Sequence, residues 1–269
     1  MMNSNHVKLM RALYSMFSVE DKVVIVTGAG QGMGAATAEL FAEAGSKVVV
    51  ADFNEKTGKE VVERIRANHG EASFVKTDVS DEEQVKAMVE FAVKKYGRLD
   101  AAINNAARKP DDKPLVEMDI NEFDAIMAVD LRGVALCMKY EIKQMMKQGG
   151  GGSIINTASV SGIRPQPSNP AYVTAKHGVI GLTKAAAVDY SIHGIRINSI
   201  APGAIDTPML RDALVRFNLD PDDYAIQLSM LGRFGQAEEI AKAYLWLTSD
   251  LSSFVTGTCL PVDGGYVNK

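Results

Sequence analysis

A tyrosine and a lysine are spaced in this chain as a proton-transfer pair would be. Tyr172 and Lys176 stand four residues apart in NPAYVTAKHGVIGLTKAAA (169–187), whose apolar residues recur at the helical period after Pro170. Residues at this spacing share one face of a helix, so the ammonium would lie beside the phenol. A neighbouring cation commonly lowers a phenol's pKa of about 10 by roughly 1–3 units. The pair could therefore take the proton from an alcohol that loses a hydride.

Ser159 could hold the oxygen of the same substrate. It ends a predicted strand, GSIINTAS (152–159), and comes thirteen residues before Tyr172. Its hydroxyl could donate a hydrogen bond to that oxygen while charge develops on it. Each residue also has an ordinary explanation, because Tyr–Lys pairs are common on surface helices and serines are common at strand ends. The order of strand, Ser159, loop, Tyr172 and Lys176 favours catalysis.

A glycine-rich turn near the start of the chain is typical of a dinucleotide site. The predicted strand KVVIVTG (22–28) runs into TGAGQGMG (27–34), where Gly28, Gly32 and Gly34 allow a sharp turn and a close approach of backbone to ligand. The amides at the start of the following helix would then face a pyrophosphate. The strand before the turn and the helix after it supply the context that this interpretation requires.

An acidic residue at the end of the second predicted strand, SKVVVAD (46–52), suits the ribose of the same ligand. Asp52 could accept hydrogen bonds from both ribose hydroxyls, and it would repel a 2′-phosphate. Because no Arg or Lys stands within the glycine turn, NAD(H) is favoured over NADP(H). Taken alone, Asp52 could equally be a strand-end carboxylate beside a turn.

The elements that carry these residues alternate along the chain. Short β-branched runs alternate with longer amphipathic ones after residue 20, which predicts an α/β fold: a doubly wound, mainly parallel sheet covered by helices on both faces. Residues 21–269 are expected to form one Rossmann-like domain, with residues 1–20 as an N-terminal extension. The predicted strands are 22–28, 46–52, 73–79, 99–107, 152–159, 195–203 and 256–265, and the predicted helices are 32–45, 55–69, 81–97, 120–147, 171–192 and 237–248.

Composition excludes several kinds of partner. The 269 residues are 46% hydrophobic with a net charge of −4 and no Lys/Arg cluster, which disfavours nucleic acid or an anionic membrane. Neither a signal peptide nor an apolar run of membrane-spanning length is recognisable. Cys137 and Cys259 lie far apart, which fits a reducing cytoplasm rather than a disulfide framework. The four histidines are scattered, so no metal site is expected.

Several short motifs together resemble the short-chain dehydrogenase/reductase family over nearly everything from residue 20 onward. They occur in the family's order and spacing: TGAGQGMG (27–34), Asp78–Val79, NNAA (104–107), Ser159, the Tyr172/Lys176 pair, APGAIDTP (201–208) and VDGG (262–265). The resemblance implies seven parallel strands, a nicotinamide dinucleotide at their carboxyl ends, and hydride transfer between this cofactor and a hydroxyl or carbonyl carbon. It also implies a homotetramer or a homodimer built on helices 120–147 and 171–192.

The resemblance also assigns cofactor contacts. Asp78 and Val79 would meet the adenine, Asn104 and Ala106 would line the floor, and Ile205 with Thr207 would hold the carboxamide side. Ala107 replaces a common glycine of the family. The residues expected to contact NAD are Gly28, Gln31, Gly32, Met33, Gly34, Asp52, Phe53, Asp78, Val79, Asn105, Ala106, Tyr172, Lys176, Pro202, Gly203, Ile205 and Thr207.

One residue departs from the family pattern at a position that matters. Asp130 stands where the family usually has the asparagine that holds a water next to the lysine. A carboxylate could keep this relay, and its charge would stabilise the ammonium of Lys176 while opposing phenolate formation at Tyr172. We therefore expect Asp130 to be catalytic and to move the activity optimum to higher pH. The alternative is a helix carboxylate that points elsewhere and pairs with Arg132 or Lys139.

The substrate is less sharply defined by the sequence. Segments 107–117, 160–169 and 205–231 should surround the nicotinamide, with 107–117 as a polar loop at the rim and 205–231 as a lid. The apolar residues of the lid suggest a neutral, hydrophobic secondary alcohol or ketone, with cyclic alcohols among the candidates. A 3-oxoacyl carrier-protein ketoreductase and a non-catalytic dinucleotide sensor stay as alternatives.

Overall fold

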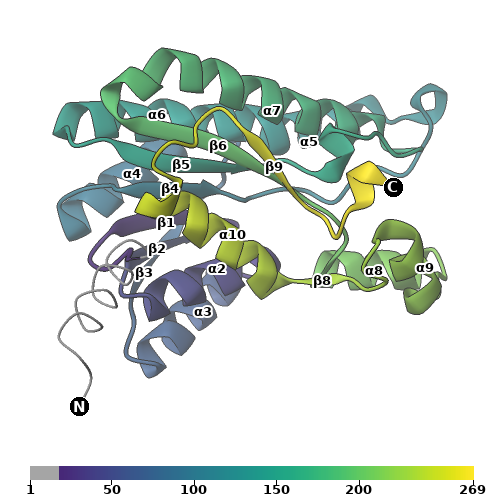
Figure 1. Ribbon diagram of the computed structural model, residues 1–269, viewed down its shortest axis with the longest axis horizontal. Coiled ribbons are helices and arrows are strands. Elements are labelled where there is room, and N and C mark those ends of the chain that lie inside the picture. Colours follow the sequence, from purple (N-terminus) through teal and green to yellow (C-terminus); the bar gives the residue numbers. More distant parts are fainter. Residues whose placement is uncertain (1–17) are drawn as a thin grey trace, which may run out of the picture.

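The computed structural model describes residues 18–269, so nearly all of the predicted N-terminal extension lies outside the described residues. A seven-stranded parallel sheet runs through the centre, with the strand order β3-β2-β1-β4-β5-β6-β9 (Figure 1). This arrangement confirms the predicted α/β fold. The strands are β1 (Val23–Thr27), β2 (Lys47–Asp52), β3 (Glu71–Lys76), β4 (Ala101–Asn104), β5 (Gly152–Thr157), β6 (Ile195–Pro202) and β9 (Cys259–Val262).

Helices cover both faces of the sheet, which explains the continuous apolar runs of the strands. Val23 and Ile25 of β1 enter the core on one face of the sheet, whereas Val24 and Val26 enter the core on the other face. All four side chains are at most 1% exposed because neither face of the strand meets water. The covering helices are α2 (Gly32–Glu43), α3 (Glu55–Ala67), α4 (Glu82–Tyr96), α6 (Val134–Gln148), α7 (Pro170–Tyr190) and α10 (Ala237–Thr248).

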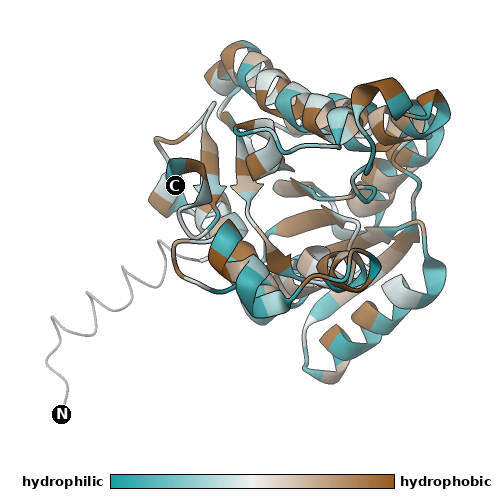
Figure 2. Cartoon of the chain, turned by 90° about the vertical axis from the view of Figure 1, so that its right-hand side faces the viewer, coloured by the Kyte–Doolittle hydropathy of each residue, from teal (hydrophilic) through white to brown (hydrophobic). Residues whose placement is uncertain are grey.

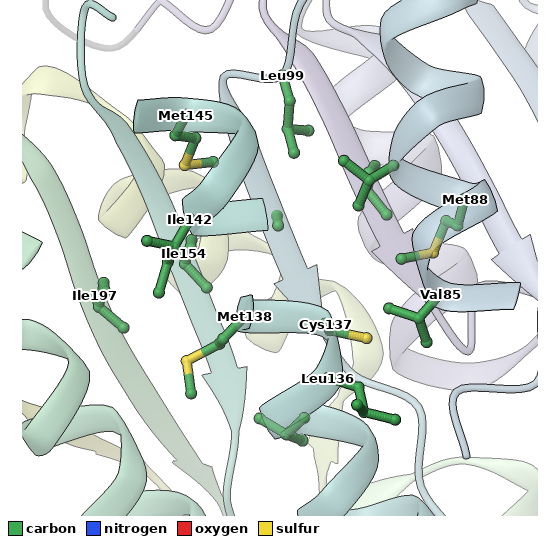
Figure 3. Packing of buried hydrophobic residues seen from close by; sticks show 14 of the residues in the cluster. Val85, Met88, Leu99, Leu136, Cys137, Met138, Ile142, Met145, Ile154 and Ile197 are labelled. Carbon is green, nitrogen blue, oxygen red and sulfur yellow. The ribbon is translucent and has the colours of Figure 1, made fainter. Parts of the chain in front are cut away.

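Packing beneath α4 and α6 illustrates how the sheet is held. Met138, Ile142 and Met145 of α6 project toward the sheet, where they meet Ile154 of β5 (Figure 3). Cys137 lies in the same cluster and is a free cysteine. Viewed from the end of the molecule, the strands are largely hydrophobic between helical layers that carry hydrophilic residues (Figure 2).

The predicted helix 120–147 is interrupted in the structure. Helix α5 (Ile120–Met127) passes into a π-helical turn, Ala128–Gly133, before α6 begins. Gly133 packs closely on Val79 there, because a Cβ at Gly133 would lie 2.9 Å from a methyl carbon of Val79. The wider turn brings Asp130 to a fully buried position. Such turns are often found at functional sites.

The carboxyl ends of the strands converge where the strand order reverses, between β1 and β4. Ligands of open parallel sheets bind at this place. Helices α8 (Pro208–Arg216) and α9 (Pro221–Leu228), which make up most of the predicted lid, lie at one end of the molecule near the C-terminal residues (Figure 1). They stand between the paired short strands β7 (Ile205–Asp206) and β8 (Gly235–Gln236). Within residues 18–269, no helix is long and apolar enough to cross a membrane.

Candidate active site

Lys176 is the centre of a buried group of polar atoms. Its side chain is 1% exposed, and its ammonium donates to the carbonyl oxygen of Thr157 at 3.1 Å. The same nitrogen lies 3.2 Å from Oδ2 of Asp130 and 5.2 Å from the centre of the Tyr172 ring. The structure therefore brings together the lysine, the tyrosine one turn before it, and the unusual aspartate. Helix α7 supplies the first two, and the π-helical turn supplies the third.

The pKa of Tyr172 reflects opposing influences. Burial of the phenol raises its pKa above 10.0, the ammonium of Lys176 lowers it, the carboxylate of Asp130 raises it, and the hydroxyl of Ser159 lowers it. The balance in the protein alone is a raised pKa, although the predicted effect of Lys176 is present. The expectation that the lysine by itself makes the phenol acidic is therefore incomplete, because desolvation outweighs it. A further positive charge beside the phenol would shift this balance toward the phenolate.

Asp130 and Lys176 form an ion pair out of contact with water. Burial by itself lowers the pKa of Lys176, but the carboxylate of Asp130 and the phenol of Tyr172 outweigh it and leave the pKa raised. Burial also raises the pKa of Asp130, in opposition to the lysine and to the backbone N–H of Arg108, which donates to Oδ1 at 2.8 Å. The predicted alternative partners are engaged elsewhere. Arg132 donates to the carbonyl oxygen of Ser80, and Lys139 pairs with Glu82.

Ser159 lies two residues after the end of β5, which stops at Thr157 rather than at Ser159 as predicted, and it is 8% exposed. Its backbone is extended, and its Oγ accepts a hydrogen bond from the N–H of Ser161 at 3.1 Å. Because that bond uses Ser159 Oγ as an acceptor, the hydroxyl proton is free to be donated to a ligand oxygen or to Tyr172. The short turn after Ser159 packs against α7, since a Cβ at Gly162 would lie 2.7 Å from the carbonyl oxygen of Lys176.

Asp111 lies beside the candidate site, where no pattern in the sequence predicts it. The segment 107–117 was expected at the rim, yet Asp111 is only 5% exposed. Its two carboxylate oxygens accept hydrogen bonds from the backbone N–H groups of Ala171 and Tyr172, both at 3.0 Å. No local pattern identifies this contact, because it joins residues about sixty positions apart across a loop. The prediction that the whole loop lies at the rim was therefore wrong at this residue.

The glycine turn fits a pyrophosphate. Gly34 packs against the carbonyl oxygen of Gly28, so that a side chain at position 34 would collide with backbone. Helix α2 begins at Gly32, and within the described chain its N-cap residue Gln31 makes no side-chain capping bond. By contrast, Asn54 and Asp81 cap the first turns of α3 and α4. The open amides at the start of α2 are thus a suitable anion site.

Asp52 lies at the end of β2 and is held toward the glycine turn. Its Oδ2 accepts a hydrogen bond from the N–H of Gly30 at 2.8 Å, and its Oδ1 accepts one from the N–H of Asn54 at 2.8 Å. Each oxygen retains acceptor capacity, so the carboxylate can still receive ribose hydroxyls. The neighbouring Phe53 is 73% exposed beside this position.

The segment after β4 forms a wall next to the glycine turn. The hydroxyl of Thr27 accepts hydrogen bonds from the N–H groups of Asn105 and Ala106, at 3.0 and 3.1 Å. The side chain of Asn105 also donates to the carbonyl oxygens of Thr27 and Gly28. Asn104 differs from its prediction. Its side chain donates to Glu141 and Asn156 in the core, so it does not line the floor.

The remaining predicted contacts lie around the same strand ends. Thr207 caps α8 and stands opposite Gly32, since a Cβ at Gly32 would lie 3.4 Å from the methyl carbon of Thr207. Ile205 is buried in the core below it, and Gly203 packs against Asp263. Asp78 is exposed and caps its own turn through Ser80, next to the buried Val79. Part of the predicted set therefore meets at the carboxyl edge of the sheet.

Among residues 18–269 there is no cluster of His, Cys, Asp or Glu that could hold a metal ion.

The fold and these contacts define a class: a dinucleotide-binding α/β protein with a tyrosine–lysine pair at its strand ends. A family model described as Enoyl-(Acyl carrier protein) reductase matches residues 28–267.

Known proteins resemble nearly the whole chain. The short chain dehydrogenase/reductase astE of Aspergillus oryzae is 47% identical over 250 residues, which cover 93% of this chain and 96% of astE. A 2,5-dichloro-2,5-cyclohexadiene-1,4-diol dehydrogenase of Sphingobium indicum is 45% identical over 252 residues, which cover 93% of this chain and 99% of that enzyme. The chain therefore belongs to the short-chain dehydrogenase/reductase family, whose members are oxidoreductases that bind a nicotinamide dinucleotide.

Solved structures agree with this assignment. The crystal structure of levodione reductase superimposes with a TM-score of 0.87 at 39% identity, covering 93% of this chain and 98% of that chain. A structure from Agrobacterium tumefaciens with bound NADP gives a TM-score of 0.84 at 32% identity, covering 94% and 99%.

Proposed function

We propose that this protein is an NAD-dependent oxidoreductase that interconverts a secondary alcohol and its ketone. The observation that carries the proposal is the buried ammonium of Lys176, which lies beside the ring of Tyr172 at the strand ends where a dinucleotide would bind. The proposed catalytic residues are Ser159, Tyr172, Lys176 and Asp130. Other members of the proposed cofactor set are Gly28, Gly32, Gly34, Asp52, Asn105, Ala106 and Thr207.

The chain's own residues would move the proton. Ser159 donates a hydrogen bond to the substrate oxygen, and the phenolate of Tyr172 takes the hydroxyl proton as the carbon–hydrogen bond breaks. Lys176 lowers the pKa of the phenol and can donate to ribose hydroxyls, while Asp130 and the carbonyl of Thr157 hold the ammonium in place. When bound, an oxidised nicotinamide would supply the acceptor for the hydride and, before the transfer, a positive charge beside the phenol. Reduction of a ketone follows the same path in reverse.

Asp52 supports NAD as the cofactor. Its carboxylate is oriented by two backbone N–H groups, and a 2′-phosphate at the ribose would approach that negative charge. Asp52→Ser should therefore lower kcat/KM for NAD+ and reduce the preference of the enzyme for NAD+ over NADP+. The measurement is kcat/KM for each cofactor with one alcohol. A parent enzyme that prefers NADP+ would overturn this part of the proposal.

Exposed apolar side chains support a neutral, hydrophobic substrate. They occur in the three segments predicted to surround the nicotinamide, 107–117, 160–169 and 205–231. The last of these contains α8 and α9 and is the proposed lid. Relatives named for a cyclohexadiene diol and for levodione favour a cyclic alcohol or ketone. The large apolar residues exposed in these segments are Leu115, Val116, Ile163, Met209, Val215, Phe217, Ile226, Met230 and Leu231.

A turnover panel tests the proposal. NAD+ reduction is followed with cyclic alcohols, diols, steroids, sugars and linear alcohols, and NADH oxidation with cyclic ketones and a 3-oxoacyl thioester. The Tyr172→Phe variant should bind NADH as the parent does and lose kcat by roughly 10²–10⁴-fold, which is the usual contribution of a general base. Turnover only of the thioester would favour a carrier-protein ketoreductase. Cofactor binding without turnover of any substrate would favour a dinucleotide sensor.

Self-association is part of the proposed working form. Small and apolar residues line a groove between the π-helical turn and α7, among them Leu131, Gly181 and Ala185. A second apolar area is formed by Val188 in the last turn of α7, Ile192 just after this helix, and the fully exposed Phe254. The hydrogen bond between Ser191 and Thr256 links the two segments of this area. Each area suits a second copy of the chain, and two such areas support a homotetramer.

Sedimentation measures this assembly directly. Ala185→Glu places a charge in the groove and Phe254→Ser removes the other apolar anchor, so each variant should reduce a tetramer to a dimer. A parent that sediments as a dimer and is unaffected by Phe254→Ser would restrict the interface to the groove.

The free cysteines Cys137 and Cys259 suit a reducing cytoplasm, which we propose as the location.

A further inference from the structure

The helix that carries Tyr172 is capped from a distant loop. Its own N-cap residue, Asn169, makes no side-chain capping bond within the described part of the chain. Asp111 instead accepts hydrogen bonds from the N–H groups of Ala171 and Tyr172, both at 3.0 Å. Helices α3, α4, α5 and α9 are each capped by the residue that directly precedes them. The start of α7 is therefore tied to another part of the fold in a way that these helices are not.

This cap acts on Tyr172 itself. One of the two capping bonds is made by the backbone N–H of Tyr172, so the position of its Cα depends on where Asp111 lies. The carboxylate is 5% exposed, and the positive end of the helix dipole stabilises its charge. Since both oxygens are used, a shorter or neutral side chain cannot reproduce the contact.

The loop segment that carries Asp111 is held at both of its ends. The backbone N–H of Arg108 donates to Oδ1 of Asp130, the partner of Lys176. The carboxylate of Asp112 forms an ion pair with Arg216 of helix α8. Residues 108–112 therefore contact Asp130 of the buried ion pair, the start of the tyrosine helix and the proposed lid, which are far apart in the sequence.

We propose that Asp111 is a positioning residue for hydride transfer. It fixes Tyr172 relative to Lys176 and Ser159, and its loop joins that geometry to the lid. This inference rests on the proposed function of Tyr172 as the base. Displacement of a reacting group by about 1 Å can cost roughly a hundredfold in rate, so a lost tether at the tyrosine's own amide should affect kcat.

The experiment compares Asp111→Ala with Asp81→Ala. Asp81 caps α4 through the N–H groups of Glu83 and Gln84, at 3.0 and 3.2 Å, so its loss removes the same kind of interaction from a helix without a proposed catalytic residue. Both variants should lose stability. Only Asp111→Ala should lose kcat for alcohol oxidation, by roughly 10–100-fold, with the KM for the alcohol and the affinity for NADH unchanged. Asp111→Asn keeps one acceptor oxygen and should recover part of the rate.

Several results would overturn the inference. Full kcat in Asp111→Ala, measured well below its unfolding temperature, would reduce Asp111 to a helix cap. Equal losses of kcat in Asp111→Ala and Asp81→Ala would mean that the effect comes from stability. If Asp111→Ala does not fold, Asp111→Asn decides by the same comparison with Asp81→Asn. A parent without turnover would instead refute the proposed function. In that case, faster hydrogen exchange at the Tyr172 amide of Asp111→Ala than of the parent would still show that Asp111 holds this amide.

Discussion

Asp130→Asn should move the pH dependence of alcohol oxidation to lower pH. The carboxylate lies 3.2 Å from the ammonium of Lys176, which lies 5.2 Å from the centre of the Tyr172 ring, so the carboxylate is at most about 8.4 Å from that centre. At an effective dielectric constant of about 20, two unit charges at that separation repel by about 2 kcal/mol. Asp130 thus opposes formation of the phenolate, because its carboxylate raises the pKa of Tyr172.

The assay is the pH profile of kcat/KM for oxidation of one good alcohol substrate, between about pH 6 and pH 10. In the parent, the rate rises with pH as Tyr172 loses its proton, and the midpoint of that rise should move to lower pH in Asp130→Asn by roughly 1.5 pH units, the equivalent of about 2 kcal/mol. Glu63→Gln is the control, because it removes an equal charge from an exposed position on α3. The control should leave the midpoint in place.

Two results would refute this reasoning. Superimposable profiles would show that the charge of Asp130 does not reach the phenol. A shift to higher pH would show that Lys176 loses its proton when its partner is neutral, because the pKa of this buried lysine is held up by Asp130. The carbonyl of Thr157, which remains as an acceptor at 3.1 Å, is expected to prevent that loss.

Two further predictions concern stability and cofactor binding. Burial raises the pKa of Glu141 from 4.5 to about 8, so the fold favours the protonated carboxyl and parent stability should fall as the pH rises through this interval, by up to about 5 kcal/mol. Glu141→Gln should abolish that slope in thermal unfolding, and equal slopes would contradict it. Gly34→Ala should weaken NADH binding by at least about tenfold in fluorescence titrations, because its methyl group would collide with the backbone of Gly28. An unchanged affinity for NADH would show that the backbone of the turn can move to accommodate the methyl group.

Features encoded by local periodicity were predictable from the sequence. The runs Val23–Thr27 and Lys47–Asp52 indicate buried parallel strands because their apolar residues are continuous, and both are strands of the observed sheet. The glycine turn and the spacing of Tyr172 and Lys176 depend only on neighbours within a helical turn. The helix boundaries near Asp130 were less accurate, because a π-helical turn leaves no distinct apolar period.

Contacts between distant segments were decided by the tertiary structure. Asp130 had three possible cations in the sequence, and only the crossing of the π-helical turn with α7 selects Lys176. Asn104 adjoins the cofactor wall along the chain, yet its side chain turns toward Glu141 in the core.

The amino-acid sequence by itself determined the parallel sheet, the dinucleotide turn and the tyrosine–lysine pair, since periodicity and short spacing specify them. Only the tertiary structure decided that Asp111 caps the helix of Tyr172 and that a buried carboxylate holds Lys176. The physical reason is that a hydrogen bond or an ion pair depends on distance in space, which for residues far apart in the chain is set by how helices and loops pack on the sheet.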